Sequence, residues 1–154
     1  MDIKIRTAKP EDVTWMIPEL RKFAVFSQNK YNLFPEDETY IRKNFENLIL
    51  NHIVLVAESF NAEGTAEGIG FIAGMYSAHA FNPAIQTLIE LFWWVKEEYR
   101  KCSAGLRLLN EFDAIGEKTA NWIIFTLETV SPVNEETLLK RGFKLKERNY
   151  LKEI

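Results

Sequence analysis

Three apolar segments with strand-like composition follow one another in the middle of the chain. They are HIVLVAE at residues 52–58, IGFIAGMYSAHAF at 69–81 and QTLIELFWWV at 86–95. A linker rich in glycine and small polar residues follows the first segment, and Asn82 and Pro83 mark a turn after the second. Runs of β-branched and aromatic residues between such turns are typical of strands. We therefore expect three consecutive strands, joined as hairpins into an antiparallel meander.

Helical periodicity marks the segments on either side of this meander. Apolar residues recur every three to four positions in EDVTWMIPELRKFAVF (11–26), in the segment 38–49 and in LRLLNEFDAIGEKTA (106–120). We expect a helix in each, and Pro18 predicts a kink or a break in the first. IKIRT at 3–7 alternates apolar and charged residues, which indicates a half-buried opening strand.

The C-terminal part of the sequence predicts two more strands around a short helix. NWIIFTLE at 121–128 is almost wholly apolar, as is typical of a central strand of a sheet. Ser131 as N-cap and Pro132 in the first turn would open the helix VNEETLLKR. Gly142 would end this helix in the left-handed conformation, and FKLKERNYLKEI at 143–154 would supply the last strand or strands.

The predicted elements define a fold class. Their order is β-α-α-β-β-β-α-β-α-β, which predicts an α+β fold with a mixed, mostly antiparallel sheet flanked by helices. A length of 154 residues is typical of one domain, and we expect a single domain over 1–154.

Charge and residue counts exclude several functions. The net charge of -3 argues against a nucleic-acid-binding surface, which is usually basic. Cys102 is the single cysteine, and His52 and His79 show no metal-ligand spacing, so neither a disulfide within the chain nor a metal site is predicted. The apolar runs are shorter than a membrane span, and the first residues do not resemble a signal peptide. We therefore expect a cytoplasmic protein that does not associate with membranes.

Small residues separate the third strand of the meander from the next helix. The segment 102–105 reads Cys-Ser-Ala-Gly, and Arg100 and Lys101 precede it. Small side chains would let an anion approach the first-turn N–H groups of the helix, which are unpaired and carry the positive end of the helix dipole. This pattern predicts a phosphate site, with a pyrophosphate as the natural ligand. The alternative is that small residues only let the helix pack closely against the sheet. Neither the dinucleotide-binding glycine pattern nor the P-loop pattern is present.

The segment VKEEYRKCSAGLRLL (95–109) resembles the acyl-CoA pyrophosphate motif of the GNAT superfamily of N-acetyltransferases. The matching positions are Val95, Tyr99, Arg100, Gly105, Leu108 and Leu109. Glu97 stands where the motif usually has proline, and Ser103 stands where it has its first glycine. The resemblance extends to IKIRTAKPED at the opening strand and to LLKRGFK near the C-terminus. The CSAGLRLL stretch is also similar to that of GNAT-like proteins encoded by bacteriophages.

This resemblance implies acetyl transfer from acetyl-CoA to a primary amine, by direct attack in a ternary complex. The acceptor would be a small molecule or a peptide. Acetyl-CoA would lie in the splay between the strands 86–95 and 121–128. The implied cofactor-binding residues are Trp93, Trp94, Val95, Arg100, Lys101, Cys102, Ser103, Ala104, Gly105 and Ser131. The loop 26–38 would shape the acceptor site, and a homodimer is a further expectation.

The catalytic groups are less well defined by the sequence. Glu90 is the only carboxylate in its strand, and an inward orientation would raise its pKa and suit it to act as a base. It could equally face solvent, and His79 is an alternative base. Leu138 occupies the position where the family often has a tyrosine acid, so Tyr150 and Ser131 are the candidate substitutes. A GNAT-like module that binds CoA or a partner protein without catalysis is the alternative function.

Overall fold

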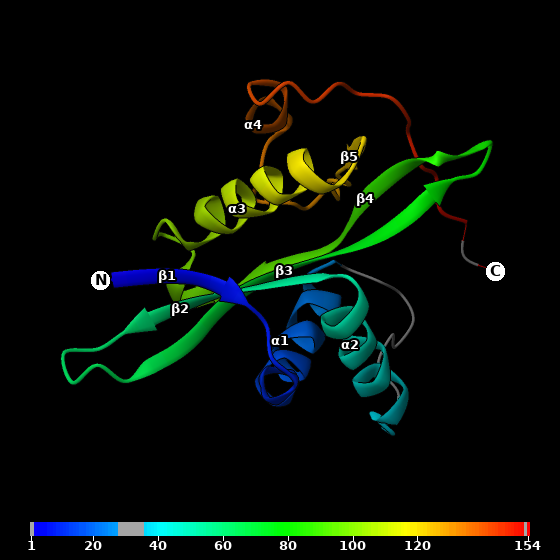
Figure 1. Cartoon of the computed structure of the whole chain (residues 1–154). Helices are drawn as coiled ribbons and strands as arrows, with labels where there is room; N and C mark the ends of the chain where they lie inside the picture. Colours follow the sequence, from blue (N-terminus) through cyan, green and yellow to red (C-terminus); the bar gives the residue numbers. More distant parts are fainter. Residues whose placement is uncertain (1, 28–35, 153) are drawn as a thin grey trace.

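A five-stranded sheet in the order β1-β2-β3-β4-β5 forms the middle layer of the molecule. The computed structural model describes residues 2–27, 36–152 and 154 of the chain (Figure 1). The elements are β1 (Asp2–Thr7), α1 (Val13–Phe26), α2 (Thr39–Asn51), β2 (Ile53–Phe60), β3 (Ala66–His79), β4 (Asn82–Val95), α3 (Ala104–Thr119), β5 (Trp122–Ile124) and α4 (Glu135–Leu139). Neighbouring strands are antiparallel except β4 and β5, which are parallel. The predicted meander corresponds to β2, β3 and β4, and the α+β class with a mixed sheet is confirmed.

Helices cover both faces of this sheet (Figure 1). On one face, Met16 and Ile17 of α1 and Phe45 of α2 pack with the inward side chains of the strands. On the other face, Leu108 and Phe112 of α3 form a second apolar cluster with the opposite side chains. The alternation of apolar residues along the strands thus supplies two cores. None of the described helices is long and apolar enough to cross a bilayer.

Arg6 joins the opening strand to the first helix. Its guanidinium donates to both carboxylate oxygens of Asp12, at 2.7 and 2.9 Å, and to Glu58 on β2 at 2.7 Å. Asp12 also accepts a hydrogen bond from the backbone N–H of Lys9 at 2.7 Å. The family-like stretch IKIRTAKPED therefore has a structural role here, because its charged residues fix where α1 begins.

Two features of β4 shape the region around the candidate site. Phe92 pairs with Ala73 and Glu90 with Gly74, so Leu91 is an extra residue in a β-bulge. The parallel pairing with β5 covers only three residues of each strand and ends at Ile89. Beyond this point β4 and the chain that follows β5 separate.

The C-terminal part of the sequence differs from its prediction. Residues 143–152 form no strand, so the predicted last strand is wrong for the part of this segment that the structure describes. The segment nevertheless follows β5 through side-chain contacts. The ring of Phe143 lies 5.4 Å from that of Phe125, and Lys146 Nζ lies 4.2 Å from the ring of Trp122. These contacts run in an antiparallel direction.

The strand predicted at 121–128 is shorter and differently placed than expected. It is β5, which covers three residues and lies at the edge of the sheet. The prediction of a central strand is wrong, because the rest of this apolar segment lines a cleft instead of pairing with a second strand.

Three local predictions also need correction. α1 continues through Pro18 without a break. Proline has no N–H to donate to the carbonyl of Thr14, but both residues are exposed, so water can hydrate that carbonyl. The turn between β3 and β4 precedes Asn82, and β4 begins at that residue. Asn134, and not Ser131, is the N-cap of α4, since its side chain accepts a hydrogen bond from the N–H of Thr137 at 3.1 Å. Gly142 has a φ of 88°, as predicted for a left-handed cap.

Candidate functional site

A cleft of about 400 Å³ lies where β4 and the chain after β5 diverge. The beginning of α3 and the segment before α4 form its other walls. The predicted site residues that line it are Glu90, Trp93, Trp94, Val95, Arg100, Cys102, Gly105 and Ser131. These predicted residues span 41 positions of the sequence, from Glu90 to Ser131, and the fold brings them together in one cleft. The expected separation of the segments 86–95 and 121–128 is present, although the second segment is a strand only at Trp122–Ile124, and the cleft lies between them.

Glu90 faces this cleft, which answers the question that the sequence left open. Its side chain is buried, with 8% of the residue exposed. Burial raises the pKa of the Glu90 carboxyl to about 7, and the negative charge of Glu128 adds to this effect. The backbone N–H of Thr126 donates to the carboxylate and acts in the opposite direction. Near neutral pH this group can therefore both accept and return a proton.

Arg100 brings positive charge to the other end of the cleft. Its guanidinium lies over the ring of Trp94 at 4.4 Å and over that of Phe26 at 5.1 Å. Its Nε donates to the carbonyl oxygen of Val95 at 3.3 Å. Stacking on aromatic rings holds the arginine against the cleft wall without neutralising its charge. An anionic ligand can therefore be paired there.

The first turn of α3 also borders the cleft. Ser103 is the N-cap, and its side chain makes no capping hydrogen bond. Its carbonyl accepts from the N–H of Arg107 at 2.9 Å. The N–H groups before Arg107 lack intrahelical acceptors, as in any α-helix, and they carry the positive end of the helix dipole. This arrangement can hold a phosphate.

The two smallest residues of this turn have different roles. Ala104 is fully buried in the core under α3, so its small size serves packing. Gly105 lines the cleft, and a Cβ there would lie 3.6 Å from Val95 and 3.7 Å from Trp93, which is ordinary contact. Helix packing therefore does not require a glycine at 105. The space in front of Gly105 is available to a ligand.

A small polar cluster holds the preceding turn, Glu97–Tyr99, against β3. Glu67 accepts hydrogen bonds from Lys96 Nζ at 2.7 Å and from the Tyr99 hydroxyl at 2.8 Å. The N–H of Cys102 then donates to the carbonyl of Tyr99 at 3.1 Å. The tyrosine of the family-like motif thus fixes the backbone from which Arg100 extends.

Some predicted site residues lie elsewhere. Tyr150 is 88% exposed and is not part of the cleft lining, so the structure does not bring it to Glu90. Lys101 and Ser103 are exposed beside the cleft, and their side chains do not line it. Leu138 is buried in α4. His79 packs against Trp122, with ring centroids 4.9 Å apart, and lies outside the cleft.

The acceptor loop predicted at 26–38 is only partly described, because residues 28–35 lie outside the described residues. Within the described part, Asp37 accepts from the N–H of Thr39 at 2.9 Å, and Glu38 accepts from Arg21 at 2.8 Å. These carboxylates do not line the cleft.

Sequence reasoning missed several residues of the cleft. Phe23 comes from α1, which precedes the other walls by more than sixty residues and carries no local sign of a site. Phe26, the first residue of the predicted acceptor loop, lines the cleft as well. Thr126 and Glu128 also line the cleft, just after β5. Both residues belong to the segment 121–128, which the sequence resemblance placed beside acetyl-CoA without naming either of them.

No protein-family model and no curated protein matches the sequence. Solved structures do match over nearly the whole chain. A transcriptional regulator from Bacillus halodurans superposes with a TM-score of 0.74 at 16% identity, over 99% of this chain and 100% of that chain. A predicted acetyltransferase with acetyl-CoA from Clostridium acetobutylicum gives 0.74 at 13% identity, over 99% and 96%. An aminoglycoside acetyltransferase from an uncultured soil metagenomic sample gives 0.63 at 17% identity, over 100% and 98%. The chain therefore has the fold of the GNAT acetyltransferases, as the sequence resemblance predicts.

Proposed function

We propose that this protein is an N-acetyltransferase that moves the acetyl group of acetyl-CoA to a primary amine by direct attack in a ternary complex. The observation that carries the proposal is one cleft that holds two sets of groups: on β4 a buried Glu90 whose pKa is raised to about 7 and, after the end of β4, Arg100 and the start of α3. The first set of groups suits proton transfer from an amine. The second suits the pyrophosphate of CoA.

The residues of the cleft would share the reaction as follows. Glu90 and Glu128 attract the ammonium form of the acceptor, and the Glu90 carboxylate takes its proton. The amine nitrogen then attacks the thioester carbonyl carbon. The new C–N bond replaces the C–S bond, and the second proton that the nitrogen loses passes through water to the leaving thiolate, which becomes the free thiol. The bulge removes Leu91 from the ladder with β3, so its backbone N–H is the candidate donor to the oxyanion.

A matched set of variants tests this assignment. We expect Arg100→Glu to weaken acetyl-CoA binding in calorimetry by at least about tenfold, because it reverses a charge beside the pyrophosphate. Lys43→Glu makes the same charge change on the exposed side of α2 and should leave binding unchanged. We expect Glu90→Gln to lower kcat by about a hundredfold with acetyl-CoA affinity retained. Turnover is measured as free thiol released with a panel of primary amines.

The second candidate is a GNAT-fold module that binds CoA or a partner protein without catalysis. Leu138, at the position of the family's tyrosine acid, favours it. Acetyl-CoA binding that depends on Arg100, together with no thiol release from any amine, would favour this second function. The absence of acetyl-CoA binding at high micromolar concentration would contradict the transferase and the CoA-binding form of the second candidate.

A further inference from the structure

A carboxylate from the first helix reaches the buried side of Trp94. Glu19 lies in α1, and only 6% of the residue is exposed. Its Oε2 accepts a hydrogen bond from the Trp94 indole N–H at 2.9 Å, and its Oε1 accepts one from Lys22 Nζ at 2.6 Å. Both carboxylate oxygens therefore have a donor, and one of these donors belongs to a residue that lines the cleft. Nothing in the proposed acetyl transfer uses Glu19.

Glu19 is charged at neutral pH despite its burial. Burial alone would raise the pKa of its carboxyl, but the hydrogen bonds from Lys22 and Trp94 outweigh this effect and the pKa is lowered. The indole N–H thus donates to a carboxylate, which makes this hydrogen bond stronger than one between neutral groups. The bond also polarises the indole and makes the face of its ring more negative. Such a ring face attracts a cation.

The cation on that ring is Arg100. Its guanidinium lies 4.4 Å from the centroid of the Trp94 ring, and Arg100 lines the cleft close to the start of α3. Glu19, Trp94 and Arg100 thus form a chain of contacts from α1 through β4 to the turn before α3. Glu19 does not itself line the cleft, so it can influence the cleft only through Trp94.

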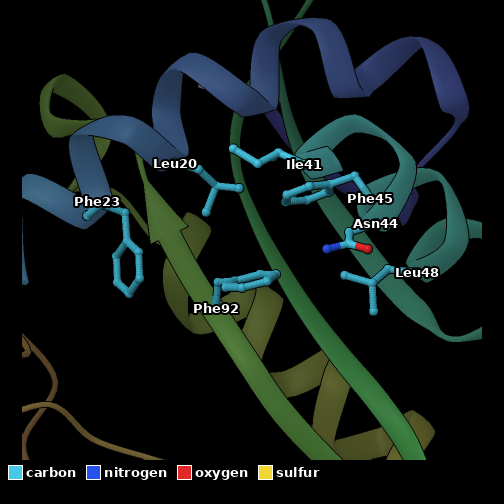
Figure 2. A pocket seen from close by; sticks show the side chains of 8 residues that line it. Leu20, Phe23, Ile41, Asn44, Phe45, Leu48 and Phe92 are labelled. Atoms are coloured by element: carbon cyan, nitrogen blue, oxygen red, sulfur yellow. The ribbon is translucent and has the colours of Figure 1, made fainter. Parts of the chain in front are cut away.

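Packing alone leaves the Trp94 ring incompletely held. The rings of Phe23 and Phe26 contact it edge-on, each at 5.9 Å. Phe23 also borders a cavity of about 230 Å³ between α1, α2 and β4, into which Leu20 and Phe92 project (Figure 2). A side chain beside a cavity lacks contacts on that side and shifts more easily than one in a close-packed core. A directional hydrogen bond is therefore needed to fix the orientation of the indole.

We propose that Glu19 is a positioning residue of the cofactor site: its hydrogen bond to Trp94 holds the indole in the orientation on which Arg100 lies, and so presents the guanidinium to the pyrophosphate of acetyl-CoA. The inference rests on the acetyl-CoA binding of the proposed function and adds to it a residue of α1 that does not touch the cofactor. Without the carboxylate oxygens the buried indole N–H would be unpaired, and the ring would turn to find another partner. The surface under Arg100 would then move.

Two variants of Glu19 separate its hydrogen bond from its charge. Glu19→Gln and Glu19→Met both remove the charge, so the long-range effect of that charge on an anionic ligand is lost equally in both. Only glutamine keeps an oxygen that can accept from the Trp94 N–H. We expect calorimetry to give an acetyl-CoA Kd for Glu19→Met about fivefold higher than that for Glu19→Gln, because leaving a buried donor unpaired is worth about this factor.

A ligand without the pyrophosphate tests whether the effect passes through Arg100. S-acetylpantetheine has the thioester and the pantetheine arm of acetyl-CoA but lacks the pyrophosphate. We expect its Kd to agree within about twofold between the two Glu19 variants, whereas a general loss of structure in the cleft would weaken both ligands. In an Arg100→Ala background, glutamine and methionine at position 19 should give equal affinities for acetyl-CoA, because the group that Glu19 positions is then missing.

The outcomes distinguish the positioning role from the proposed function. Equal acetyl-CoA affinities of Glu19→Gln and Glu19→Met, a loss that S-acetylpantetheine shares, or a difference that persists without Arg100 overturns the positioning role and leaves acetyl-CoA binding intact. The expected difference without turnover of any amine supports the positioning role and contradicts the transferase. An unchanged protein that does not bind acetyl-CoA at high micromolar concentration overturns both. If circular dichroism shows that Glu19→Met does not fold, Glu19→Leu makes the same comparison.

Discussion

Gly105 and Gly116 lie in the same helix, and packing requires a glycine only at 116. A Cβ at 116 would lie 2.6 Å from the side chain of Ile123, too close without a shift. At 105 the nearest atoms would be 3.6 Å away, in Val95. The fold has room for a Cβ at position 105, and this position lines the cleft. We therefore infer that a ligand, and not packing, is the reason for a glycine there.

We expect Gly105→Ala to raise stability and weaken binding at the same time. Alanine is favoured over glycine by about 0.5–1 kcal/mol in a helix interior, so we expect a smaller gain at Gly105, the second residue of α3, where the new methyl group has room within the protein. The same methyl group enters the space proposed for the pyrophosphate and should weaken acetyl-CoA binding by about tenfold. Urea unfolding and calorimetry measure the two effects. Gly116→Ala is the control, and it should lose stability with unchanged affinity. Tight binding by Gly105→Ala would remove Gly105 from the cofactor site.

The sequence identified these small residues as a group but could not separate their roles. The direction in which residues 104 and 105 face depends on where α3 begins. The periodic pattern predicted a helix start at 106, whereas α3 begins at Ala104. With the helix start known, Ala104 points to the core and Gly105 to the cleft. Glu90 shows the same limit, because a single carboxylate in a strand does not reveal which face it occupies.

At the scale of elements, hairpins were predictable and the C-terminal region was not. The meander of β2, β3 and β4 follows from local turns and strand composition. The segment 121–128 is not apolar because it is a central strand. Its residues Ile123 and Phe125 pack in the core under α3, and its last residues line the cleft. Composition alone does not distinguish a strand covered by neighbours from a chain that covers a cavity.

Phe143 anchors the C-terminal segment, and its removal should be costly. Its ring packs on Phe125, which in turn contacts Phe112 at 5.4 Å and Trp93 at 6.3 Å. We expect Phe143→Ala to lower the free energy of unfolding by about 2 kcal/mol, through lost apolar burial and a lost edge-to-face contact.

Tyr150→Ala is the control in the same segment. Because Tyr150 is 88% exposed, this change should cost less than about 0.5 kcal/mol. Urea unfolding at neutral pH measures both variants. Equal effects would mean that the contact between Phe143 and Phe125 does not hold this segment in place.

At the scale of the whole molecule, the site and the stability of the fold are linked through Glu90. In the unfolded chain its carboxyl has the ordinary pKa of 4.5, and in the folded protein burial raises the pKa to about 7. The folded state therefore binds the Glu90 proton more tightly than the unfolded state. As pH rises from about 4.5 to about 7 the unfolded chain loses this proton first, so the contribution of Glu90 to stability falls, and above pH 7 it falls no further. A cleft that keeps a base at this pKa thus lowers the stability of the fold at neutral pH.

Glu90→Gln should remove this dependence, since glutamine does not titrate and its amide oxygen can still accept from the N–H of Thr126. Relative to the unchanged protein, we expect the variant to gain about 3 kcal/mol of unfolding free energy between pH 4.5 and pH 7.5, at about 1.4 kcal/mol per pKa unit. Urea unfolding of both proteins at several pH values measures the difference, in which the other titrating groups cancel. Glu128→Gln is the companion variant, and it should lower the pKa of Glu90 and reduce the same slope by a smaller amount, because the Glu128 charge is a secondary cause of the shift. A stability difference that stays constant over this range would mean that Glu90 titrates as a solvated carboxylate. Its proposed role as a base working near neutral pH would then lose its physical ground, because a pKa near 7 and the stability slope have the same cause.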